Sequence, residues 1–161
     1  MREIKFRGKR YGDGAWVYGS LYQGSKGRRK YSVILSDAGY HLAPQDDRNL
    51  AIAFTENEVN VVIPDTVCQF VGLCDKYGKE IYEGDILRGF EYPFYDAEAD
   101  AYNYYAIVDW DTNEAQFYAY HDLARGAQVR GASCGVGVDM EDLREMEVIG
   151  NIYDNLGLLK K

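Results

Sequence analysis

Short runs rich in Tyr, Val and Ile recur along this 161-residue chain, and turn residues separate them. The first run, EIKFRGKR, alternates apolar and basic residues, which is the two-residue period of a half-buried strand. YGDG follows it and supplies the positive φ angles of a hairpin turn, and AWVYGSLY then reads as the returning strand. Fifteen Tyr and 17 Gly against three Pro agree with many strands joined by turns. We therefore predict a mainly β protein built from antiparallel hairpins.

The later strand-type runs are KYSVILS, LAIAF, VNVVI, TVCQFVGL, ILRGF and EVIGNIYDN. AIVDW and AQFYAY flank DTNE and predict one more hairpin, with its turn over residues 111–114. One or two short helices complete the fold: DMEDLREM favours one or two helical turns, with Asp139 as N-cap. A short helix across residues 46–54 is the alternative to a strand there. In the second strand we expect Trp16, Tyr18 and Leu21 to enter a core.

The chain is long enough for one domain or for two small ones, and at this size it can bury roughly 70% of its unfolded surface. We place an N-terminal β region at residues 1–62 and a C-terminal β region at residues 63–161. A single intertwined unit is the alternative.

The sequence indicates a cytoplasmic protein. It contains no run of about 18 apolar residues that could cross a membrane. Its first ten residues, MREIKFRGKR, are charged and lack the apolar core of a signal peptide. The three cysteines, Cys68, Cys74 and Cys134, match no paired spacing and are expected to be free thiols in a reducing compartment.

Charge is divided unevenly along the chain. Residues 1–30 carry nine Lys or Arg and two acids, a net charge of +7. Residues 31–161 carry nine Lys or Arg and 24 acids, a net charge of −15. A basic segment of this kind can contact phosphates, and an acidic one can attract a basic partner. The simpler interpretation is that opposite charges meet within the fold or between subunits, and we favour it.

No motif predicts catalysis, a metal site or a bound cofactor. Acids crowd the segment DKYGKEIYEGDIL, but they flank Gly78 and Gly84, so we interpret them as turn and cap residues. The runs that begin at Asp96 and Asp109 resemble the start of a calcium loop, yet both lack the Gly and the Glu that such a loop needs at its sixth and twelfth positions. Two histidines offer no zinc spacing. We predict that the chain is not an enzyme.

Two candidate contact surfaces remain. The stretch 91–105 mixes aromatic and acidic residues, and aromatic patches on a protein surface often mark contact sites. Its candidate interaction residues are Tyr92, Phe94, Tyr95, Asp96, Glu98 and Asp100. In the alternative reading, the basic N-terminal segment binds nucleic acid, with Tyr and Trp available for stacking. The candidate phosphate contacts are then Arg7, Lys9, Arg10, Arg28, Arg29 and Lys30.

Three segments together resemble the YopX family of small proteins encoded by bacteriophages and prophages. They are MREIKFRG with WVYGSL, then TVCQFVGLCDKYGKEIYEGDIL, then EVIGNIYDN, in this order. The resemblance implies a mainly β protein whose C-terminal part is similar to a small SH3-like barrel. It implies no catalytic residues. Cys68, Val71 and Cys74 depart from the pattern, and the stretches 91–105 and 124–138 look like additions to it.

We therefore expect a non-enzymatic, oligomeric protein-interaction module of phage or prophage origin. Its partner would be a second copy of the chain, or a host or phage protein, and it would have no membrane contact. The alternatives are a nucleic-acid-binding protein that uses the basic N-terminal segment, and an acidic mimic of nucleic acid.

Overall fold

The computed structural model describes residues 3–36, 41–46, 49–53, 59–89, 104–121 and 142–159. Contacts divide the chain into a first unit, Met1–Phe70, and a second unit, Val71–Lys161. The sequence placed this division between residues 62 and 63. The segment that follows residue 62 stays with the first unit because Gln69 pairs with Phe6 in the N-terminal strand.

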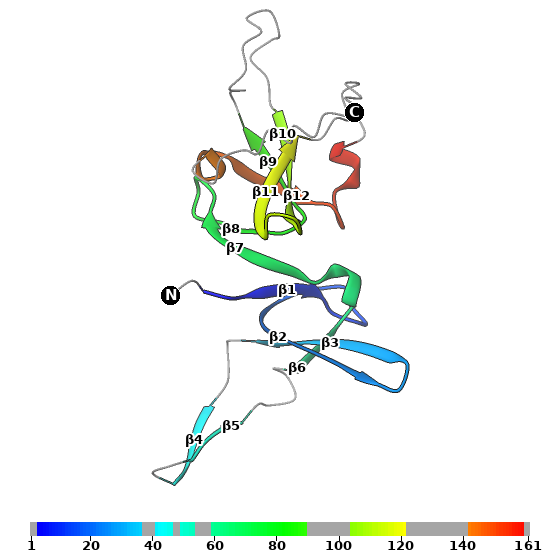
Figure 1. Ribbon diagram of the computed structural model, residues 1–161, viewed down its shortest axis with the longest axis vertical. Helices are drawn as coiled ribbons and strands as arrows, with labels where there is room; N and C mark the ends of the chain where they lie inside the picture. The colour runs from blue at the N-terminus through cyan, green and yellow to red at the C-terminus, as the bar shows by residue number, and fades with distance from the viewer. Residues whose placement is uncertain are drawn as a thin grey trace, which may run out of the picture. The chain divides into compact units, whose positions relative to one another are not determined.

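The first unit is built from antiparallel strands (Figure 1). Its strands are β1 (Phe6–Lys9), β2 (Trp16–Lys26), β3 (Arg29–Ser36), β4 (His41–Asp46), β5 (Asn49–Ala53), β6 (Val59–Val62) and the start of β7 (Cys68–Cys74). Strands β6, β3, β2, β1 and β7 lie in this order in one sheet, and β4 with β5 forms a separate hairpin. The prediction of a mainly β protein is confirmed, and β5 occupies the segment for which a helix was the alternative.

A β-bridge joins the end of β1 to the edge strand β6. Arg10, directly after β1, pairs with Val62 of β6. The Tyr11 N–H donates to the Val61 carbonyl at 3.0 Å, and the Ile63 N–H donates to the Lys9 carbonyl at 2.8 Å. Strands β1, β2, β3 and β6 therefore close into a ring at this point.

The inner face of the ring is tightly packed, and it holds the polar residues Ser32 and Asn60 beside apolar ones. The side chains of Ile34 and Val62 are fully buried there. A Cβ added to Gly8 would lie 3.2 Å from both of them, so the absence of a side chain on β1 lets the strands approach closely.

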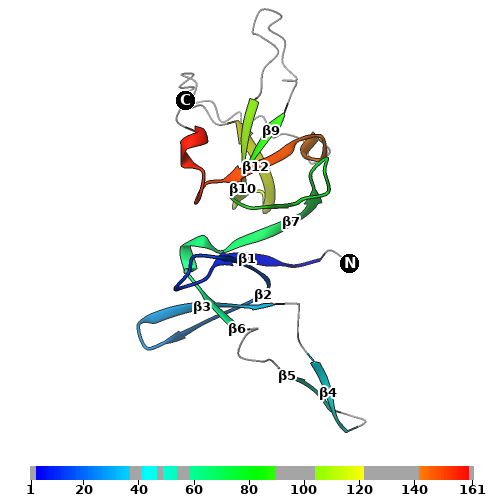
Figure 2. The ribbon, with the colours of Figure 1, turned by 180° about the vertical axis from the view of Figure 1, so that it is seen from behind.

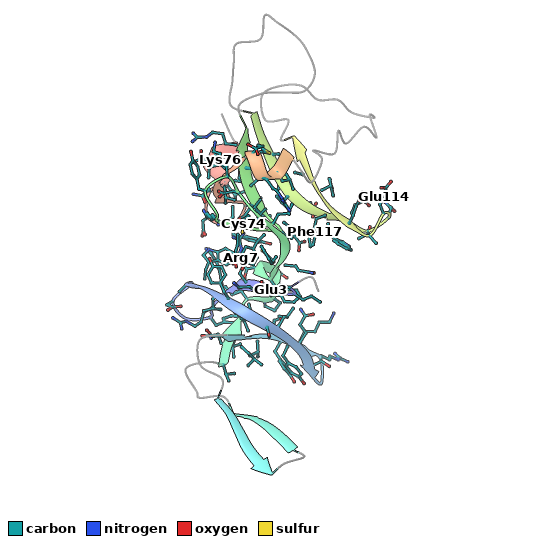
Figure 3. All side chains as sticks on the ribbon, turned by 90° about the vertical axis from the view of Figure 1, so that its left-hand side faces the viewer. Glu3, Arg7, Cys74, Lys76, Glu114 and Phe117 are labelled. Carbon is teal, nitrogen blue, oxygen red and sulfur yellow. The ribbon has the colours of Figure 1, made fainter. Side chains whose placement is uncertain are left out.

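The second unit holds a four-stranded antiparallel sheet in the order β11-β10-β9-β12 (Figure 2). The strands of this sheet are β9 (Asp85–Gly89), β10 (Tyr104–Asp111), β11 (Gln116–His121) and β12 (Glu147–Asn151). The short strand β8 (Glu80–Tyr82) pairs with β7 instead. One face of the sheet contributes to a core cluster of Val71, Ile81, Leu87, Ala106, Val108, Phe117, Ala119, Leu143, Met146 and Val148. Figure 3 shows Phe117 and, at the turn between β10 and β11, Glu114. The SH3-like detail of this part stays a prediction.

Helical structure in the described residues is limited to three single turns of 3-10 helix. They are η1 (Pro64–Thr66), η2 (Asp142–Glu145) and η3 (Leu156–Leu159). The turn η2 lies within the segment predicted to be helical. None of the helices in the described part of the chain is long and apolar enough to cross a membrane.

Candidate functional site

The segment between β7 and β9 is rich in acids, and its buried carboxylates are the main candidates for chemistry in the described residues. Asp75 is buried, and its two oxygens accept three backbone N–H groups. Oδ1 accepts from Tyr77 at 2.8 Å and from Lys79 at 2.9 Å, and Oδ2 accepts from Val148 at 3.0 Å. The same turn places Gly78 at φ +82°, which suits glycine. Asp75 therefore fixes the turn and ties it to β12.

Burial and hydrogen bonding act on the Asp75 carboxyl in opposite directions. Burial would raise its pKa, because it disfavours the charged form. The three amide hydrogen bonds, together with the charge of Lys79, favour the carboxylate and outweigh burial, so the pKa of Asp75 lies below its usual value. The group is a stable anion that holds backbone donors.

Asp85 has the same structural role at the next turn. It is almost fully buried, and its Oδ2 accepts the Tyr82 N–H at 2.8 Å. Gly84, one residue earlier, has φ +77° and donates its N–H to the Val108 carbonyl at 2.8 Å. The interpretation of Asp75 and Asp85 as turn and cap residues is confirmed.

The cysteines and the other possible metal ligands do not gather at one place in the described part of the chain. Cys68 is buried, outside any disulfide, and its Sγ donates to the Thr66 carbonyl at 3.3 Å. Cys74 is exposed, and Cys134 lies outside the described residues. Within residues 3–36, 41–46, 49–53, 59–89, 104–121 and 142–159, no three His, Cys, Asp or Glu side chains are grouped so that they could hold a metal ion.

The predicted interaction residues of the stretch 91–105 cannot be placed, because residues 90–103 lie outside the described part of the chain. They are Tyr92, Phe94, Tyr95, Asp96, Glu98 and Asp100. They stay a prediction.

The six predicted phosphate contacts fall into two groups, and the first lies on and just after β1. Arg7, which Figure 3 labels, is only 5% exposed. Its guanidinium lies 4.7 Å from the centroid of the Trp16 ring. Lys9 lies over the same ring at 5.6 Å. Arg10 is paired with Asp13, and its Nη1 donates to Asn60 at 3.3 Å. The cations of this group are packed on aromatic or polar neighbours.

The second group lies at the far end of the β2–β3 hairpin. Arg28 and Lys30 are exposed, and Arg29 is placed in β3 opposite Lys26 of β2. The six residues are thus not brought together at one place. The side chain of Arg10 in the first group is also exposed, but it is paired with Asp13, whereas Arg28 and Lys30 lie in a segment without acids.

A surface that the sequence did not predict lies on the outer face of the ring. Register places Tyr22, Val33 and Val61 in one row across β2, β3 and β6, and Leu35 opposite Val59 in the next row. We define the outer apolar face as Tyr18, Tyr22, Val33, Leu35, Val59 and Val61. Four of these side chains are well exposed: Tyr18 at 43%, Tyr22 at 58%, Val59 at 44% and Val61 at 48%.

The prediction that Tyr18 enters a core is wrong, and Trp16 and Leu21 are only half-buried. The strand was recognised correctly, but alternation alone does not say which face is inside. The sequence held a partial signal for this surface in β6. Val59 and Val61 lie on one face of the strand, and Asn60 and Val62 lie on the other, so at least one valine had to face the solvent or a partner.

Comparisons with known proteins agree with this fold. No curated protein matches the chain. Among solved structures, the crystal structure of protein EF1440 from Enterococcus faecalis has a similar fold, with a TM-score of 0.56 and 20% identity over 99% of each chain. The family model described as YopX protein matches residues 5–160, nearly the whole length. The chain therefore belongs to the YopX family.

Proposed function

We propose that this protein is a non-enzymatic interaction module that self-associates through the outer apolar face. The observation that supports the proposal is an exposed row of valines and tyrosines across β2, β3 and β6. Exposed apolar side chains gathered on one face of a soluble protein usually mark a contact surface. We include in the proposal a phage or prophage origin, which the family resemblance implies, and a cytoplasmic location, which the sequence indicates.

A second copy of the chain is the occupant that fits best. The outer apolar face contains no charged side chain along its three strands. This holds from Tyr18 to Tyr22 in β2, from Val33 to Leu35 in β3, and at Val59 and Val61 in β6. A two-fold contact brings the same patch of each subunit together. Arg7, which pairs with Tyr18 at the edge of this face, is already buried against Trp16. Two copies can therefore meet on the uncharged positions without burying a further charge, which would be costly.

The absence of an enzymatic role is part of the proposal, and the acids of the central segment support it. The carboxylates of Asp75 and Asp85 are buried and accept backbone N–H groups. A general acid or base needs a proton that can be exchanged with a substrate. Groups held in this way are poor candidates for that task.

The experiment is a measurement of molar mass by light scattering after size-exclusion chromatography. We expect the unmodified protein to be a dimer or larger, and Val61→Asp to shift it to the monomer by placing a charge in the contact. The matched control is Leu156→Asp, because Leu156 is similarly exposed, at 53%, but belongs to the second unit. Circular dichroism verifies that both variants remain folded.

Two results would overturn the proposal. The first is a monomeric unmodified protein at every concentration tested. The second is a folded Val61→Asp variant whose molar mass equals that of the unmodified protein.

A further inference from the structure

The outer half of the β2–β3 hairpin forms an arm. Strand β1 pairs with β2 only up to Gly19, and β6 pairs with β3 only from Ser32 onward. From Gln23 to Tyr31, the two strands pair with each other alone, in a register that runs to Lys26 opposite Arg29. Figures 1 and 2 show the tip of this light-blue hairpin extending past its neighbouring strands β1 and β6. We call residues 23–31 the basic arm.

The charge of the arm is entirely positive. Its tip, residues 26–30, reads KGRRK and carries four cations in five residues. No Asp or Glu occurs between Asp13 and Asp37. Arg28 and Lys30 are exposed, so their charges are presented to the solvent. The tip is therefore a concentrated positive site in a chain whose net charge is −8.

The arm has small residues along its sides, and two tyrosines pack against each other where it joins the sheet. Gly24, Ser25 and Gly27 keep its sides small. At the base, the rings of Tyr22 and Tyr31 lie 6.2 Å apart, and the Tyr31 ring lies so close to Gly24 that a Cβ there would be 2.5 Å from its hydroxyl oxygen. Packing of this kind fixes the direction of the arm before a partner arrives, which lowers the entropy lost on binding.

We propose that the basic arm is a binding site for double-stranded DNA, with its tip cations on backbone phosphates. The major groove of B-form DNA is wide enough for a two-stranded β-ribbon, which is what the arm is. Lys and Arg that neutralise phosphates release counterions, and this release supplies most of the affinity of binding that does not depend on sequence.

The shape of the site separates duplex DNA from other nucleic acids. The major groove of an RNA duplex is too narrow for side chains to read. Sites for single strands combine a basic groove with a row of stacking aromatics, whereas the tip has no aromatic residue among positions 26–30. The cations of the arm are not among the residues of the outer apolar face, so the proposal does not depend on self-association.

The test measures binding to a short labelled DNA duplex by fluorescence anisotropy at several salt concentrations. With four phosphate contacts per chain, the slope of log affinity against log salt is about −3.6, so affinity falls about 150-fold between about 50 and about 200 mM salt. Removing two cations with the double variant Arg28→Gln and Lys30→Gln should flatten this slope by about 1.8.

A matched control removes two positive charges from the second unit. It is the double variant Lys76→Gln and Arg144→Gln, which gives the same net charge as the arm variant. Its slope should equal that of the unmodified protein, because a general charge effect would change both variants alike. The duplex is also compared with its own single strand and with an RNA duplex of the same sequence, and both should bind more weakly.

Three outcomes overturn the assignment. The first is that the unmodified protein does not bind the duplex at the lowest salt. The second is that the folded arm variant keeps the slope of the unmodified protein. The third is that the single strand or the RNA duplex binds as tightly as the DNA duplex. Loss of the slope in the arm variant alone, with the control unchanged, supports it.

Discussion

The Asp75 carboxylate accepts the backbone N–H of Val148 at 3.0 Å, across 73 positions of the chain. One buried oxygen thus joins the turn after β7 to strand β12. The other oxygen of the same group holds the turn itself, through Tyr77 and Lys79. Asp75 is therefore a single point at which local and long-range structure depend on each other.

Asp75→Asn separates these two functions. The amide oxygen can still accept from Tyr77 and Lys79, but the amide NH₂ would face the Val148 N–H, donor against donor. We expect a loss of about 1–3 kcal/mol in the free energy of unfolding, measured with urea, because a buried donor loses its acceptor. Asp65→Asn, at an exposed position in η1, should change it little. Equal stability of the two variants would contradict the role given to Asp75.

Acid should remove the contribution of Asp75 in a defined direction. Its folded-state pKa is below the unfolded value, so its contribution is complete above the unfolded pKa of about 3.9 and is lost as the pH falls through the folded pKa. The difference in unfolding free energy between the unmodified protein and Asp75→Asn should thus be largest near neutral pH and shrink in acid. A difference that grows as the pH falls would reverse the sign and refute this account.

Asp13 gives a second, independent titration. The side-chain hydrogen bond from Arg10, followed by the Ala15 N–H, lowers the pKa of Asp13 to about 2. We expect NMR titration of the Asp13 carboxyl to show this low midpoint, and Arg10→Gln to move it toward the ordinary value of about 3.9. An unchanged midpoint in the variant would show that Arg10 is not the cause.

Gly84→Ala tests the turn before β9. Gly84 has φ +77°, and a Cβ there would lie 3.2 Å from the Tyr153 ring and 3.4 Å from Ile152. Left-handed backbone costs a residue with a side chain roughly 1–2 kcal/mol, so thermal unfolding should occur at a lower temperature. The control is Gly157→Ala, where a Cβ would meet open space. If both alanines have the same small effect, backbone conformation is not what requires glycine at position 84.

Much of the fold could be predicted from the sequence because its signals are local. Alternation and turn residues identified the hairpin of β10 and β11, the turn at Gly78 and the entry to β9 at Gly84. These depend on neighbouring residues, for which chain chemistry is a sufficient guide. The central motif was likewise sufficient to predict the YopX family.

The candidate surfaces depended on information that local patterns lack. A strand with apolar residues on both faces, such as KYSVILS, does not reveal that Val33 lies on the outer face and Ile34 on the inner one. That distinction comes from the bridge between Arg10 and Val62, which closes the ring. The six basic candidates were near one another in sequence, yet burial of Arg7 against Trp16 separates it from the exposed tip of the hairpin.

The pairing of Leu35 with Val59 has a consequence for how this chain can vary in length. Because these neighbours hold the two ends of residues 37–58 side by side, that 22-residue connection starts and finishes at one place on the ring. Replacing it with a five-residue loop would lower the free-energy cost of loop closure by only about 1.3 kcal/mol. The ring could thus accept insertions and deletions between β3 and β6 while its own strands stay in register.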